Sequence, residues 1–213
     1  MPLDDLNQHC EVVRADLVAR NEARERAVTH SRELIRLCSE CIRAVHRQEW
    51  PNVEARLAQI RESAQAMHDL AHTYPDLYYT GYTQDALKEL VEAHATYAIV
   101  RDLPLPSAAE LGVTSATYLL GLSEAATELR RFILDILRRE DGDSAKAERL
   151  LEWMDAVYDQ LVTFDFPDAI TYGLRRQTDV VRGVLERTRG DLTTSLRQQR
   201  LQVALQHLES KLS

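Results

Sequence analysis

Residues 85–94 read DALKELVEAH, and this stretch decides both the fold class and the candidate chemistry. At about 100° per residue its apolar side chains form one helical stripe. Asp85, Glu89 and Glu92 fall nearly opposite that stripe, within about 60° of one another. The stretch contains no Gly, Pro or strand-like alternation. The sequence therefore predicts a helix that carries three carboxylates along one line.

Helical periodicity extends along the whole chain, which has only 7 Gly and 6 Pro in 213 residues. No segment has the alternation of a strand. The fold predicted is all-α, an elongated bundle of six or seven helices that forms a single domain over residues 1–213. The predicted helices cover residues 3–48 and 53–72, a third helix ending near 101, a short one at 107–111, and then 114–139, 144–162 and 174–208. The first would be about 60 Å long, which favours an elongated bundle or an oligomer.

Composition excludes several classes of protein. The net charge of −8 argues against a uniformly basic nucleic-acid binder, although a local basic groove stays open. No signal peptide opens the chain and no apolar run reaches membrane length, so we expect a cytoplasmic protein without a membrane partner. Cys38 and Cys41 form a CxxC inside a helical pattern, where their spacing predicts two core side chains rather than zinc ligands.

Residues 118–131 (YLLGLSEAATELRR) belong to the helix predicted at 114–139. They carry Glu124 and Glu128 one turn apart, on the flank of the apolar stripe that faces the core. The plain interpretation is that the acids of both helices are solvated, with Glu128 paired to Arg131. The alternative is that facing helices gather them around a cation. A di-iron site needs the motif Glu-x-x-His, but the residue three positions after Glu92 is Ala95. An all-carboxylate set instead suits Mg²⁺ or Mn²⁺ and phosphate-ester chemistry.

The stretches LKELVEA (87–93) and YLLGLSEAATELRR (118–131) resemble the translin family, more closely its Trax branch than translin itself. Residues 32–36 (RELIR) and the closing helix after Gly173 are similar too, so the resemblance covers most of the chain. It implies an all-α fold that assembles into a hollow homo-oligomer, a hexamer to octamer. It also implies binding of single-stranded RNA or DNA and, for Trax-like members, Mg²⁺-dependent endoribonuclease activity.

Carried over by position, the resemblance assigns Glu89, Glu92 and Glu124 as catalytic residues that hold Mg²⁺, with Mn²⁺ as the alternative cation. Glu124 departs from the family, because Trax has Asp there. Glu128 matches an acid shared more widely in the family, so it is either structural or a further metal ligand, and Asp85 stays an outer possibility. Translin proper lacks the catalytic carboxylates, so their presence here favours a nuclease.

One region departs from translin. Residues 79–83 read YTGYT, without charge, where translin has a basic segment for nucleic-acid binding. Its tyrosines would stack on bases, pack in the core or form an oligomer contact. Two other functions stay open, a non-catalytic single-strand-binding shell and a helical protein-binding scaffold. Phosphate contacts would have to come from other basic residues, with Lys88, Arg130, Arg131, Arg138, Arg139, Arg175 and Arg176 as candidates.

Overall fold

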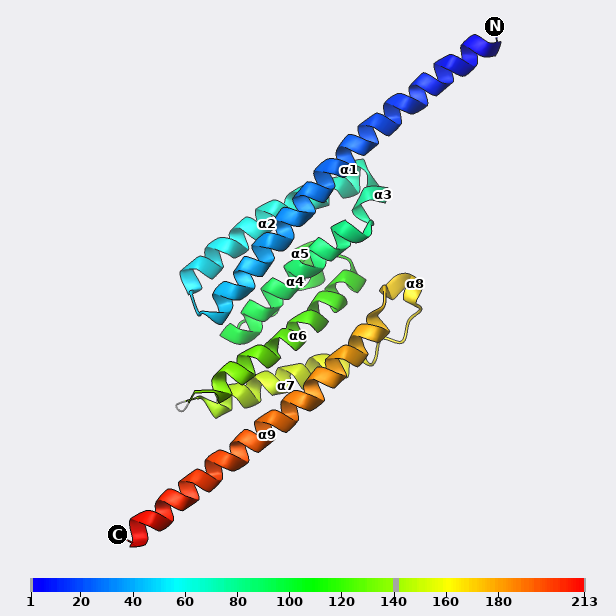
Figure 1. The fold of residues 1–213 in the computed structure, drawn as a ribbon. Coiled ribbons are helices and arrows are strands. Elements are labelled where there is room, and N and C mark those ends of the chain that lie inside the picture. Colours follow the sequence, from blue (N-terminus) through cyan, green and yellow to red (C-terminus); the bar gives the residue numbers. More distant parts are fainter. Residues whose placement is uncertain (1, 140–141, 213) are drawn as a thin grey trace. The chain divides into compact units, whose positions relative to one another are not determined.

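The computed structural model describes residues 2–139 and 142–212, and these residues form nine α-helices and no strand (Figure 1). The all-α prediction is confirmed. All seven predicted helices are present, together with two helices of a single turn that the sequence did not indicate, α3 and α8. The elements in order are α1 (Pro2–His46), α2 (Trp50–Thr73), α3 (Pro75–Tyr78), α4 (Gly81–Arg101), α5 (Ala108–Leu111), α6 (Ser115–Leu137), α7 (Ser144–Leu161), α8 (Asp168–Thr171) and α9 (Leu174–Leu212).

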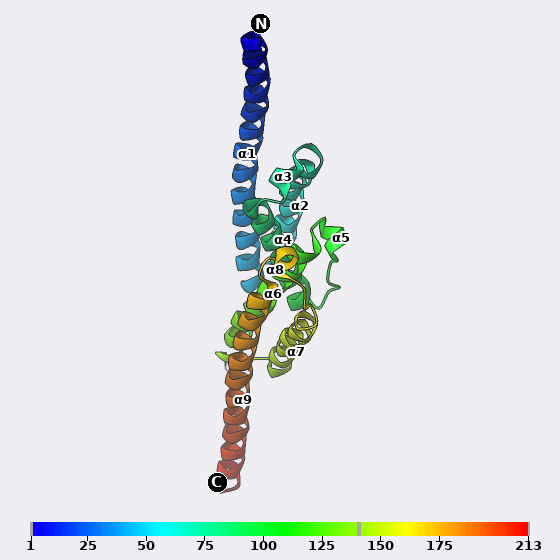
Figure 2. The ribbon, with the colours of Figure 1, turned by 90° about the vertical axis from the view of Figure 1, so that its right-hand side faces the viewer.

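The helices group into two compact units, one up to Leu90 and one from Val91 onward, with the boundary inside α4. The single-domain organisation stays a prediction. In the first unit α1 turns back into α2, and Figures 1 and 2 show these two helices side by side. Cys38 and Cys41 lie buried on α1, as predicted, and burial raises the pKa of the Cys41 thiol to about 12. A thiol with that pKa stays protonated, which fits a core side chain.

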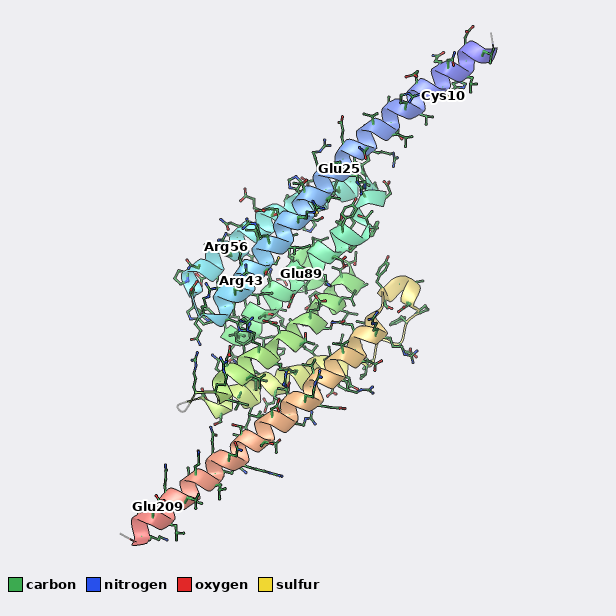
Figure 3. All side chains as sticks on the ribbon, in the orientation of Figure 1. Cys10, Glu25, Arg43, Arg56, Glu89 and Glu209 are labelled. Carbon is green, nitrogen blue, oxygen red and sulfur yellow. The ribbon has the colours of Figure 1, made fainter. Side chains whose placement is uncertain are left out.

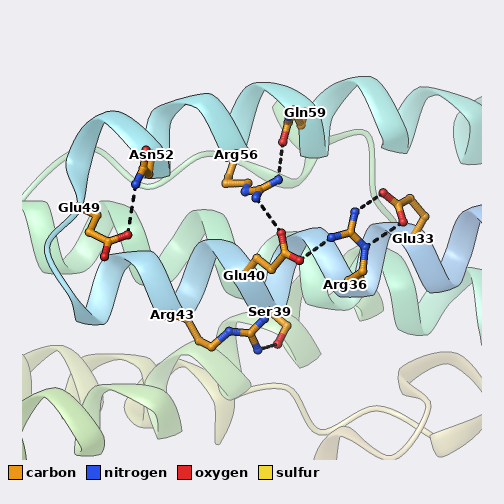
Figure 4. Close-up of polar contacts among 9 residues, drawn as sticks. All are labelled: Glu33, Arg36, Ser39, Glu40, Arg43, Glu49, Asn52, Arg56 and Gln59. Atoms are coloured by element: carbon orange, nitrogen blue, oxygen red, sulfur yellow. Dashed lines mark hydrogen bonds and ion pairs between the residues drawn. The ribbon is translucent and has the colours of Figure 1, made fainter.

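A network of ion pairs and amide contacts joins the exposed sides of α1 and α2 (Figure 4). Arg36 donates hydrogen bonds to Glu33 and to Glu40 on α1. Arg56 on α2 lies 3.0 Å from the second oxygen of Glu40 and donates to Gln59. Hydrogen bonding from Arg36 lowers the pKa of Glu33. The network is partly exposed, so we expect it to fix the register of the two helices more than to stabilise them.

In the second unit α6, α7 and α9 enclose an apolar cluster. Arg130 on α6 reaches α9, where it pairs with Asp191 at 2.8 Å and donates to Thr188 at 3.1 Å. Arg189 on α9 pairs with Asp155 on α7. The two contacts of Arg130 fix α6, one of the two helices that carry candidate ligands, against α9. The cluster consists of Ala126, Val157, Leu161, Leu174 and Val181, with Leu119, Leu120, Leu122 and Tyr158 packed against it.

Candidate metal centre

Helix α4 is buried on nearly every side, which a helix with a solvated acidic face would not be. Of its three aligned acids, Asp85 is exposed, whereas Glu89 and Glu92 are half-buried. Figure 3 labels Glu89 on α4. Charged residues are seldom withdrawn from water without a partner or a function. The environments of the three acids therefore separate Glu89 and Glu92 from Asp85.

The start of α4 is held by hydroxyl and amide side chains rather than by charge. Thr80 and Thr83 both donate to the carbonyl of Leu77, at 2.6 and 3.1 Å. Gln84 donates to the carbonyl of Tyr78 at 2.8 Å. Tyr79 is exposed beside this junction, whereas Tyr82, the other tyrosine of segment 79–83, is half-buried. Among the residues of the uncharged segment 79–83, Tyr79 is thus the tyrosine most accessible to a stacking base.

The far end of α4 is closed by α7. Asp102 adopts a left-handed conformation (φ 57°), and the amide of Leu103 donates back to Ala98. Arg149 then donates to the last carbonyls of the helix, to Ile99 at 3.0 Å and to Val100 at 3.5 Å. A cation at a helix C-terminus satisfies carbonyls that lack an intrahelical partner and complements the helix dipole. This end of α4 is therefore fixed.

Helix α6 presents Glu124 from a row of small buried residues. Thr114 caps the helix by accepting a hydrogen bond from the amide of Thr117 at 3.3 Å. Ser123 and Ala125 on either side of Glu124 are both fully buried, and Glu124 itself is half-buried. Side chains of this size let a neighbouring helix approach closely. The acid therefore stands on a packed and well-positioned part of α6.

Glu89, Glu92 and Glu124 come together: each offers one carboxylate oxygen, and these oxygens all lie within 4.8 Å of one another. At about 4 Å two like charges repel by roughly 1 kcal/mol in bulk water and by several-fold more near a protein surface. A divalent cation among them would offset that repulsion. The donors are all hard oxygens, without sulfur or imidazole, which fits Mg²⁺ or Mn²⁺.

Glu128 is not part of this group. Its carboxylate lies 3.9 Å from the guanidinium of Arg131, the i, i+3 pairing that the plain interpretation expected. The assignment of Glu128 as a metal ligand stays a prediction.

Several candidate phosphate contacts already have acidic partners. Arg138 pairs with Asp135 at 2.6 Å and Arg130 with Asp191, while Arg131 is largely exposed. Together Arg130, Arg131 and Arg138 line a groove of about 440 Å³ on α6. Sequence reasoning missed a second polar groove, of about 410 Å³, where α1 meets α2. It is lined by Arg43, Arg47 and Arg56 among others, and only the α1–α2 turn brings these residues together.

None of the helices formed by residues 2–139 and 142–212 combines the length and apolarity that crossing a membrane requires.

Comparison with known proteins gives matches over most of the chain. The chain is 32% identical over 199 residues to the uncharacterized protein MJ0175 of Methanocaldococcus jannaschii, and the match covers 92% of this chain and 87% of that protein. No protein-family profile matches.

Among solved structures, AfC3PO is similar at 33% identity and a TM-score of 0.81, covering 88% of this chain and 96% of that one. AfC3PO in complex with duplex RNA gives 32% identity, the same coverage and a TM-score of 0.79. NeC3PO without ligand gives a TM-score of 0.78 at 21% identity over 87% of this chain and 96% of that one, which supports the fold alone.

Proposed function

This chain belongs to the translin family, and on that premise we propose that it binds RNA and hydrolyses its phosphodiester bonds with the help of a divalent cation. Support for RNA binding comes from AfC3PO, which has been solved with duplex RNA and is 32% identical to this chain over 88% of this chain and 96% of that one. Support for hydrolysis comes from the chain itself. The observation that carries it is the convergence of the Glu89, Glu92 and Glu124 carboxylates within 4.8 Å.

In this proposal the three glutamates hold Mg²⁺, or Mn²⁺ in its place. A cation there would polarise the phosphodiester and lower the pKa of the water that attacks it. Glu89 and Glu92 stand one turn apart on α4, so the helix fixes the spacing of their carboxylates. Glu124 approaches from α6. Half-burial of all three strengthens their attraction for a cation, because fewer waters screen it.

The proposal includes a homo-oligomer, in the range from hexamer to octamer. The beginning of α1 supports it, because Leu3, Leu6 and Leu17 are all more than half exposed. Exposed apolar rows of this length mark interaction surfaces. Light scattering coupled to size exclusion measures the mass, and a monomer at all concentrations would remove this part of the proposal without touching the cation site.

The first prediction concerns cleavage. Purified chain is incubated with Mg²⁺ and end-labelled RNA, single-stranded in one arm and duplex in the other. Glu92→Gln and Glu124→Gln keep the side-chain shape but remove the charge that holds the cation. Because such a cation contributes several kcal/mol to the transition state, each change is expected to slow cleavage by about 100-fold or more.

Asp85→Asn is the matched control, since Asp85 is an exposed acid one turn before Glu89 on the same helix. It is expected to cleave like the wild type. Undiminished cleavage by Glu92→Gln would overturn the site. RNA binding without cleavage by any form would leave the alternative function, a non-catalytic binding shell.

A further inference from the structure

The first five turns of α1 carry an apolar row that no part of the described chain covers. We call Leu3, Leu6, Cys10, Val13 and Leu17 the outer seam. Their spacings alternate between three and four residues, which places them on one face of the helix. Cys10 and the four others are exposed, and Figure 3 shows Cys10 on the free part of α1. At 1.5 Å per residue this part of the helix is about 30 Å long.

The same alternation continues into the folded part of α1, where it is covered. After Arg20 and Arg24 the three–four spacing reaches a set that is at most 2% exposed: Ala27, Ser31, Leu34, Cys38, Cys41 and Val45. A seam of this kind is the contact line of helices that pack nearly parallel or antiparallel. The outer seam is therefore the unpartnered extension of a line that elsewhere serves as a helix–helix contact.

Arg20 marks the point on α1 where contacts with the rest of the first unit begin. This residue pairs with Asp76 of α3 at 3.0 Å, and its guanidinium lies 5.9 Å from the ring centroid of Tyr74. Beyond it Cys10, Val13 and Leu17 line an open groove of about 740 Å³. A lone helix of some twenty residues is marginal in water, and burying each large aliphatic side chain contributes about 1.5–3 kcal/mol. The segment thus has a strong reason to find a partner helix.

We propose that the outer seam packs antiparallel against the outer seam of a second copy of this chain. The inference deepens the homo-oligomer of the proposed function by assigning one of its contact surfaces, and it does not depend on RNA cleavage. An antiparallel pairing about a two-fold axis sets Cys10 opposite Val13 of the second copy and Leu6 opposite Leu17. Such a contact is self-complementary, as closed symmetric assemblies require.

The charges beside the seam favour this orientation. His9 and Asp16 occupy equivalent flanking positions, and antiparallel packing brings His9 of one copy beside Asp16 of the other. Parallel packing would instead set His9 beside Arg14 of the second copy, two groups that repel when both are charged. Parallel packing would also set Cys10 opposite Cys10.

Two adjacent valines give a matched test. Val13 lies on the seam and Val12 one position off it, and they are 57% and 66% exposed. Val13→Glu would bury a charge in the contact, so the concentration at which the assembly dissociates is expected to rise about tenfold or more. Val12→Glu is expected to leave the mass unchanged. Sedimentation velocity of the full chain over a concentration series measures both.

The inference is overturned if the wild type is monomeric, if Val13→Glu assembles like the wild type, or if both variants dissociate equally. Far-ultraviolet circular dichroism and melting verify that each variant folds, since both valines lie outside the core. Cleavage of RNA by the same preparations separates the two proposals, because the Glu92→Gln result concerns the cation site alone.

Orientation is tested with thiols. Cys38 and Cys41 are buried, so Cys10 is the accessible cysteine. In the antiparallel register Val13→Cys places a second thiol opposite Cys10, and oxidation with oxidised glutathione is expected to give a covalent dimer. The wild type is expected to cross-link far less. Equal cross-linking of the wild type would show parallel seams and contradict the proposed orientation.

Discussion

Gln48 lies two residues after the end of α1 and has a backbone conformation that side chains rarely adopt. Its φ is 58°, and around it the amide of Glu49 donates to Ala44 and that of Gln48 to Val45, a Schellman arrangement. Glycine occupies this position without a steric penalty from a Cβ atom. The chain uses glycine at the equivalent place after α5, where Gly112 has a φ of 66°.

Gln48→Gly is therefore expected to stabilise the protein by about 0.5–1 kcal/mol, because relief of left-handed strain outweighs the added flexibility of the unfolded chain. Urea denaturation measures the change. Gln59→Gly, within helix α2, is the opposite control and should destabilise. A loss of stability in Gln48→Gly would contradict the strain assigned to that turn.

His68 makes stability depend on pH. Burial lowers the pKa of its imidazole from the ordinary 6.5, and its buried Nε2 has no hydrogen-bond partner among the described residues. Between the folded pKa and 6.5 the unfolded chain binds a proton that the folded chain does not. The stabilisation is thus complete above about pH 6.5 and is lost as the pH falls through the folded pKa.

We accordingly expect His68→Gln to flatten the decline in melting temperature between pH 7 and pH 5. His72→Gln, at an exposed site on the same helix, should keep the slope of the wild type. Equal slopes in the wild type and His68→Gln would disprove this assignment.

At the residue scale, the sequence indicated which residues form the candidate site, but it did not indicate how deeply those residues are buried. The spacing of Glu89 and Glu92 and the family resemblance pointed to both, with Glu124 as their partner. Periodicity placed Glu89 and Glu92 opposite the apolar stripe of α4, which by itself indicates solvation. The structure shows them half-buried, because α4 is covered nearly all round. That cover comes from residues distant in sequence, so helical spacing alone could not show it.

Among the elements, α4 depends on a contact from another helix. Arg149 on α7 donates to Ile99 and Val100 and also to Asp102, at 3.2 Å. Arg149→Met keeps much of the aliphatic packing but leaves these acceptors unsatisfied, so a loss of about 1–3 kcal/mol in the free energy of unfolding is expected.

Arg182→Met is the comparison, since Arg182 makes an exposed pair with Asp179 on α9 and its loss should change stability little. Guanidinium chloride titration of both variants measures the difference. If the two variants lose equal stability, Arg149 does not cap α4.

Helix boundaries show what sequence patterns can predict. The end of α4 near Arg101 was predicted correctly, because Pro104 and Pro106 follow it. The starts of α7 at Ser144 and of α9 at Leu174 were also predicted correctly, because a loop precedes the first and Gly173 the second. The Ser-x-x-Glu pattern of Ser107 and Glu110, which is typical of a helix start, forms a capping box on α5. Helix α2 begins at Trp50 rather than Val53, since Pro51 lies inside its first turn. Helices α3 and α8 have four residues each, too few for a periodic pattern.

At the scale of the whole molecule, the cation site links stability to metal. A ligand that binds the folded chain at about 100 times its dissociation constant adds about 2.7 kcal/mol. For a chain of this size that corresponds to a rise in melting temperature of roughly 5–10 °C. We expect such a rise on adding Mg²⁺ or Mn²⁺ to chelator-treated protein.

Differential scanning fluorimetry measures this shift without requiring activity. Glu92→Gln should abolish most of it, whereas Asp85→Asn should retain it. A shift that survives in Glu92→Gln would locate the cation elsewhere in the chain.

The continuous seam of α1 also constrains how the gene can vary in length. Each residue added or removed between residues 18 and 26 turns the outer seam by about 100° relative to the covered one. A single-codon deletion would therefore point the outer seam toward a new direction, although every side chain in it survives. A deletion of seven codons returns the outer seam to within about 20° of its original direction and only shortens the exposed part of α1. Length variation in this helix should thus be tolerated in steps of whole heptads.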